Sequence, residues 1–119
     1  MKYLLLIYSS EAAWATPEGQ AVLPDIVARH EALQGELRAT GMDWAAARLA
    51  KTPTARTIVN QADGQVVHDG PFAETKEQLA GFYLIEAPDM AAAEAWGRKI
   101  PHIAGGKVEV REIDHAPSP

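Results

Sequence analysis

The 119-residue sequence has no cysteine, no long hydrophobic run and no surplus of basic residues. The lack of cysteine excludes disulfides, thiolate metal ligands and thiol catalysis, and it is compatible with a reducing cytoplasm. The apolar run at residues 3–8 is too short for a signal peptide, and no other stretch has the length that crossing a bilayer requires. We therefore expect a cytoplasmic protein with no membrane partner.

Basic residues are outnumbered, since 16 acidic side chains stand against 11 basic ones and the net charge is -5. This is the wrong sign for a protein that binds a phosphate backbone, so nucleic acid is not an expected partner. A small organic molecule or another protein remains open. The apolar fraction of 47% is that of ordinary globular domains, and the length fits a single domain over residues 1–119.

Alternating or helical spacing of apolar residues predicts the secondary structure. Strands are expected at residues 3–8, 42–49, 81–85 and 108–113, and helices at 23–40 and 90–99. A hairpin is expected over 57–67, with Asp63-Gly64 supplying the positive φ angles of a tight turn. Residues 73–79 are expected to form a short helical turn.

The order strand, helix, strand, hairpin, strand, helix, strand predicts an α+β domain of the ferredoxin-like split βαβ type with an inserted β-hairpin. Both alternating sets of the first and third main strands are apolar, which favours central positions for these two strands. Two helices can cover only one face of the sheet. We therefore expect a homodimer that packs sheet to sheet.

One long segment carries a family resemblance. Residues 67–85, which include Asp69-Gly70-Pro71-Phe72, resemble the defining segment of the DGPF-domain branch of the YCII-related proteins, and the two ends of the chain are also similar. The resemblance implies a dimeric α+β barrel and a site made from one histidine and one aspartate. By position these residues are His30 and Asp69.

Two functions follow from the resemblance. The wider group includes lyase-type activity on hydroxylated aromatic compounds, which implies a cofactor-independent lyase or isomerase that moves a proton on a small substrate. Members of the branch are often encoded near alternative sigma factors. This setting implies a non-catalytic alternative, a ligand-sensing or protein-interaction module in a regulatory pathway.

His30 and Asp69 each have a structural reading beside the catalytic one. His30 falls in the apolar stripe of its predicted helix, where a buried imidazole needs a polar partner and could simply bond a carbonyl. Asp69 precedes Gly-Pro, where a carboxylate commonly fixes a turn. If the carboxylate bonded the imidazole, it would fix the tautomer and make His30 a better base.

Four aromatic residues are candidates for binding a substrate. Phe72 either packs its turn onto the core, which is the favoured reading, or forms one wall of a pocket. Tyr8 and Tyr83 lie on the predicted central strands and could direct hydroxyls into a cavity, with the core as their default position. Trp44 could serve a lid or plain packing.

We expect neither a metal nor a cofactor. No two histidines have the spacing of helical metal ligands, and Gly105-Gly106 stands alone rather than within a glycine-rich phosphate loop.

Overall fold

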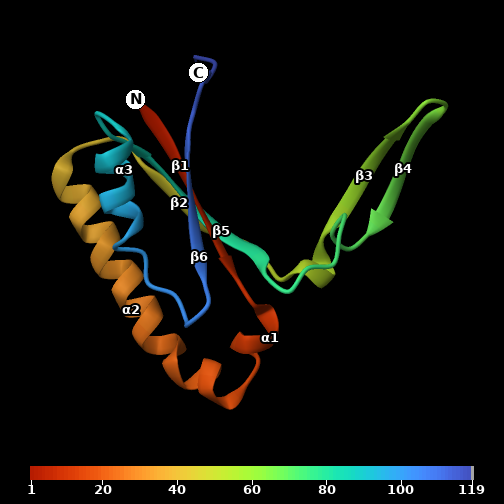
Figure 1. The fold of residues 1–119 in the computed structure, drawn as a ribbon, viewed down its shortest axis with the longest axis horizontal. Coiled ribbons are helices and arrows are strands. Elements are labelled where there is room, and N and C mark those ends of the chain that lie inside the picture. Colours follow the sequence, from red (N-terminus) through yellow and green to blue (C-terminus); the bar gives the residue numbers. More distant parts are fainter. Residues whose placement is uncertain (119) are drawn as a thin grey trace.

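The computed structural model describes residues 1–118 (Figure 1). In chain order the elements are β1 (Lys2–Ser9), α1 (Glu11–Trp14), α2 (Pro17–Thr40), β2 (Ala45–Arg48), the 3-10 turn η1 (Thr52–Thr54), β3 (Arg56–Gln61), β4 (Gly64–Asp69), β5 (Gln78–Glu86), α3 (Met90–Gly97) and β6 (Lys107–Glu112). Among these helices, none combines the length and the apolar character that crossing a bilayer requires.

The main sheet has four strands in the order β2-β5-β1-β6, and each neighbouring pair is antiparallel. The predicted α+β class is confirmed. The two strands with apolar residues on both alternating sets, β1 and β5, occupy the centre as predicted. A second sheet contains only β3 and β4, which form the predicted hairpin.

Helices α2 and α3 cover one face of the main sheet (Figure 1). Tyr3 and Leu5 of β1 point to this side, together with Tyr83 and Ile85 of β5, and all are buried. They pack against helix residues such as Leu37, because alternate side chains of a strand point to one face. This layer is the hydrophobic core.

The other alternating set remains partly exposed. We call this surface the open face, and it consists of Leu4, Leu6, Tyr8, Phe82 and Leu84 on the two central strands. No helix within residues 1–118 covers it (Figure 1). The open face is therefore an apolar sheet surface at the centre of the molecule.

Helix α2 begins at Pro17, six residues before its predicted start. Thr16 caps it by accepting a hydrogen bond from the Gly19 amide at 3.1 Å. Gly19 also allows α1 to approach, since a Cβ there would lie 2.2 Å from the Ala13 carbonyl oxygen. Proline and glycine in this segment indicate a loop when taken alone, but proline fits the first turn of a helix and the close contact requires glycine.

Three local predictions need correction. Residues 73–79 do not form a helical turn, because residues 70–77 are loop and β5 already begins at Gln78. Strand β2 is shorter than predicted and covers only Ala45–Arg48. The hairpin turns at Ala62 and Asp63, with a single positive φ of 142° at Gly64, so one positive angle suffices where two were expected.

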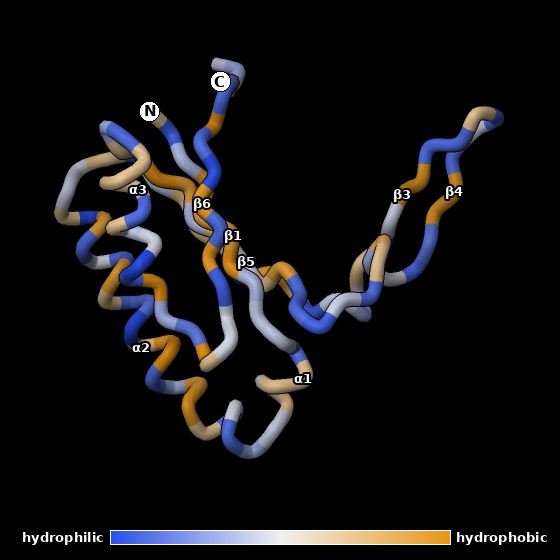
Figure 2. The backbone as a smooth tube through the Cα atoms, in the orientation of Figure 1, coloured by the Kyte–Doolittle hydropathy of each residue, from blue (hydrophilic) through white to orange (hydrophobic). Residues whose placement is uncertain are grey.

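Strands β3 and β4 form what we call the arm, residues 56–69. It extends away from the main sheet on the side opposite the helices (Figure 1). Its two strands pair with each other and with no other strand of residues 1–118. Apolar positions on both strands stand between hydrophilic ones (Figure 2). The arm therefore presents apolar side chains without an intramolecular sheet to receive them.

Candidate functional site

His30 meets Tyr83 between the helix layer and the sheet. The Nδ1 atom of His30, on α2, lies 2.8 Å from the Tyr83 hydroxyl oxygen on β5. Their rings are nearly parallel, with centroids 5.8 Å apart and an interplanar angle of 9°. Tyr83 is buried, whereas the His30 side chain is partly accessible to solvent. A polar pair thus stands at the edge of the core.

Gln34 completes this pair from the next turn of α2. Its Nε2 donates a hydrogen bond to the Tyr83 hydroxyl at 3.3 Å. An amide nitrogen can only donate, so the Tyr83 hydroxyl accepts from Gln34 and can either donate to His30 Nδ1 or accept from it. The tautomer of neutral His30 sets the direction of this bond, since Nδ1 accepts when the ring proton is on Nε2 and donates when the proton is on Nδ1. The i,i+4 spacing of His30 and Gln34 is the signal in the sequence that could have identified this third residue.

Burial sets the protonation of both partners. It lowers the pKa of His30, because the charged imidazolium is poorly solvated there, and the backbone carbonyl of Pro101 opposes this shift. Burial also raises the pKa of Tyr83, opposed by the hydrogen bond from Gln34. Both side chains are therefore neutral near pH 7. A neutral imidazole can accept a proton, which is what a general base does.

Asp69 lies in a different part of the molecule, at the end of β4 in the arm. Its side chain is 86% exposed, and its Oδ1 lies 3.3 Å from Arg56 Nη1 on the neighbouring strand. Within one chain, therefore, His30 contacts Tyr83 while Asp69 contacts Arg56. The predicted pairing of His30 with Asp69 stays a prediction, and it would need a second chain to bring them together.

The turn after Asp69 is held by two hydrogen bonds between Gly70 and residues around the start of β3. Gly70 has a φ of 92°, a value that favours glycine, and its amide donates to the Ala55 carbonyl at 2.6 Å. The Thr57 hydroxyl donates to the Gly70 carbonyl at 2.8 Å. Phe72 follows and is 88% exposed, so the expectation that it packs onto the core is wrong. Its loop leaves the end of the arm, which explains this exposure.

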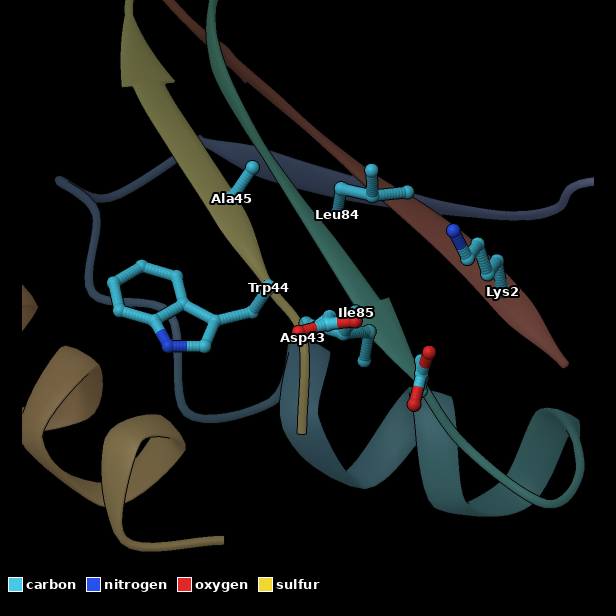
Figure 3. A pocket seen from close by; sticks show the side chains of 7 residues that line it. Lys2, Asp43, Trp44, Ala45, Leu84 and Ile85 are labelled. Atoms are coloured by element: carbon cyan, nitrogen blue, oxygen red, sulfur yellow. The ribbon is translucent and has the colours of Figure 1, made fainter. Parts of the chain in front are cut away.

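The other two aromatic candidates lie on opposite faces of the sheet. Trp44 points towards the helices, with the Arg38 guanidinium 5.4 Å from the centre of its ring (Figure 3). Tyr8 belongs to the open face. Of the four predicted binding residues, Tyr83 contacts His30, and Trp44 shares the same side of the sheet.

Two hollows lie away from His30. One, of about 110 Å³, is lined by Lys2, Asp43, Trp44, Ala45, Leu84, Ile85 and Glu86 at one end of the sheet (Figure 3). The other, of about 270 Å³, lies between α3 and β6 beside His102. Both are below the range of roughly 300–1,000 Å³ of typical ligand pockets. Among residues 1–118, no three His, Asp or Glu side chains gather where they could hold a metal ion.

Comparison with known proteins places most of the chain within one family. A family model described as the YCII-related domain matches residues 1–115. An uncharacterized protein of Rhizobium meliloti (strain 1021) is 36% identical over an aligned length of 118 residues, and the match covers 95% of this chain and 92% of the relative. The match to the family model includes both His30 and the arm.

Proposed function

Because the chain belongs to the YCII-related family, we propose that it is a cofactor-independent enzyme that moves a proton on a small organic substrate, with His30 as the acid and base. The observation that carries the proposal is the 2.8 Å contact between His30 and Tyr83. A half-exposed imidazole, kept neutral by burial and held by a buried phenol, has the protonation state and the access that proton transfer requires.

Tyr83 is the positioning residue in this proposal. Its hydroxyl can accept as well as donate, so His30 can change tautomer without losing the bond at Nδ1. The ring can then take a proton from a substrate carbon at Nε2 and return one from the same atom. A lyase or isomerase step needs both transfers. Hydroxylated aromatic compounds are the substrate class that the family resemblance favours.

The proposed assembly is a homodimer of ferredoxin-like units, the dimeric α+β barrel arrangement. The strand order β2-β5-β1-β6 with both helices on one face supports the ferredoxin-like unit. The apolar open face supports sheet-to-sheet packing of two chains. In this assembly Asp69 acts on His30 only if it comes from the other chain.

The test is exchange of substrate protons with solvent. We would incubate a panel of small carbonyl compounds and hydroxylated aromatics with the protein in D₂O and follow the loss of proton signals by NMR. We expect exchange with the wild type, a decrease of about 10²- to 10⁴-fold in His30→Gln, and a smaller decrease in Tyr83→Phe. His68→Gln is the matched control, since His68 is exposed on the arm.

Folding and activity must be measured on the same His30 variant. A His30→Gln protein that keeps its unfolding free energy but loses exchange supports the proposal. A variant that is strongly destabilised and still exchanges protons would assign His30 to the core and overturn it.

A second candidate function is a ligand-sensing or protein-interaction module without catalysis. The exposure of Asp69 and its ion pair with Arg56 favour this candidate, because within one chain Asp69 contacts Arg56 and does not orient His30. Compounds of the same panel would then bind and raise the melting temperature, while no proton exchange would occur in any variant.

A further inference from the structure

We propose that the arm of one chain packs its Ile58 and Val67 side against a second copy seated on the open face. This inference rests on the homodimer proposed above. It adds a second contact region, outside the main sheet, and it names the side chains that make the contact.

The apolar side of the arm is exposed in the single chain. Ile58 and Val67 stand opposite each other across β3 and β4, and they are 61% and 57% exposed. The opposite side of the ribbon carries Val59 and Val66, which are less exposed. An isolated two-stranded hairpin is marginally stable in water, so a ribbon with apolar residues on both sides needs a surface to cover one of them.

Polar pairs flank Ile58 and Val67 at both ends. Arg56 pairs with Asp69 on one flank, and Gln65 donates a hydrogen bond to Asn60 at 2.7 Å on the other. The first pair joins opposite charges and the second is neutral, so this side of the arm carries no net charge. An apolar centre with a neutral polar rim is the usual anatomy of a protein interface.

The direction of the arm selects the partner. It extends on the side of the sheet opposite the helices, which is the side of the open face (Figure 1). A molecule that covers the open face would therefore lie beside the arm. The same second chain can bury both apolar surfaces.

The surface area agrees with a dimer of this kind. The chain exposes 8219 Å², about 1,900 Å² more than a compact protein of its mass. Its radius of gyration is 16.3 Å, against about 13.5 Å for a compact chain of this length. Stable dimers bury roughly 800 Å² or more per partner, so the excess is large enough for one.

The base of the arm is fixed before any partner arrives. The Glu11 carboxylate accepts two hydrogen bonds from Thr52, at 2.8 Å from its amide and 2.6 Å from its hydroxyl. The Leu49 amide donates to the Ala80 carbonyl at 2.8 Å. These bonds tie the segment that enters the arm to α1 and β5. A projecting element held in this way is preorganised for binding.

Single cysteines can test the contact, because the chain has none of its own. We would introduce Val67→Cys on the arm and Val22→Cys on α2 as the matched control, since Val22 is also an exposed valine. The rate constant for reaction with a maleimide is then compared between concentrated protein, in which the chains are paired, and dilute protein, in which they are single. For Val67→Cys we expect at least about tenfold slower reaction when the chains are paired, and for Val22→Cys no change.

A second measurement uses sedimentation to follow the dimer itself. Ile58→Asp should weaken dimerisation by about tenfold or more, whereas Val22→Asp should leave it unchanged. A wild-type chain that is monomeric at every concentration overturns the homodimer and this inference with it. A dimer in which Val67→Cys reacts equally fast at both concentrations, or which Ile58→Asp leaves intact, overturns the role of the arm alone.

Discussion

The main sheet and the arm are built from similar strands but have opposite environments. Tyr83 and Ile85 on β5 are 2% and 1% exposed, while Ile58 and Val67 on the arm remain largely accessible. Both regions contain the β-branched and aromatic residues that favour strands. The difference is that α2 and α3 cover one face of the main sheet, whereas no helix of the described part of the chain covers the arm (Figure 1). Strand formation and burial are thus separate outcomes.

This contrast also divides the two candidate catalytic residues. His30 belongs to the main sheet with its covering helices, which we call the body, and there it contacts Tyr83, which Gln34 also contacts. Asp69 belongs to the arm, where its partner is Arg56. Within one chain, the two residues therefore take part in separate contacts in separate regions of the molecule.

The largest expected effect compares one apolar truncation in each region. Leu37→Ala removes a fully buried side chain beneath the sheet and should cost about 2–5 kcal/mol of unfolding free energy. Ile58→Ala on the arm should cost less than about 0.5 kcal/mol in dilute protein, because its side chain is already in water. Urea denaturation followed by circular dichroism gives both values. Equal losses would show that the arm folds as part of the core.

A smaller effect is expected where the two regions join. Glu11→Ala removes the acceptor of both Thr52 hydrogen bonds and should destabilise the base of the arm by about 1–3 kcal/mol. Hydrogen exchange should show the Thr52 amide exchanging faster, while amides of β1 and β5 keep their protection. Glu31→Ala, an exposed position on α2, is the control. Unchanged exchange at Thr52 would mean that the arm is held by other contacts.

The smallest effect is the contribution of His30 to the pH dependence of the unfolding free energy. Its pKa is lowered in the folded chain, so the unfolded chain binds the proton more readily and stability is lost as the pH falls below about 6.5. The slope cannot exceed about 1.4 kcal/mol per pH unit for one proton. Denaturation between pH 8 and 5 should show a weaker dependence in His30→Gln, with His68→Gln on the arm as control. An identical dependence in His30→Gln would mean that His30 is not buried in solution.

Much of the architecture could be predicted from local patterns. The apolar alternation of residues 3–8 and 81–85 predicted two central strands, and both are central. The hairpin was predicted at residues 57–67, although its turn lies one residue earlier than Asp63-Gly64. These features depend on neighbouring residues, which is why periodicity and turn chemistry reveal them.

The contacts of the candidate site were harder to predict. Both alternating sets of β5 are apolar, so the sequence did not indicate whether Tyr83 faces the helices or the open face. The partner of His30 is 53 positions away, and it is reached only when α2 packs on the sheet. Phe72 was expected in the core for its apolar ring, yet its loop follows an arm that leaves the body.

The sequence by itself determined the main strands and the two longer helices, their order and the two central strands, because backbone preferences and side-chain periodicity act over a few residues. Only the tertiary structure decided that His30 meets Tyr83 and that the arm stands away from the sheet. Those outcomes depend on which face the helices cover. That choice is made by packing between segments far apart in the chain, and no local pattern records it.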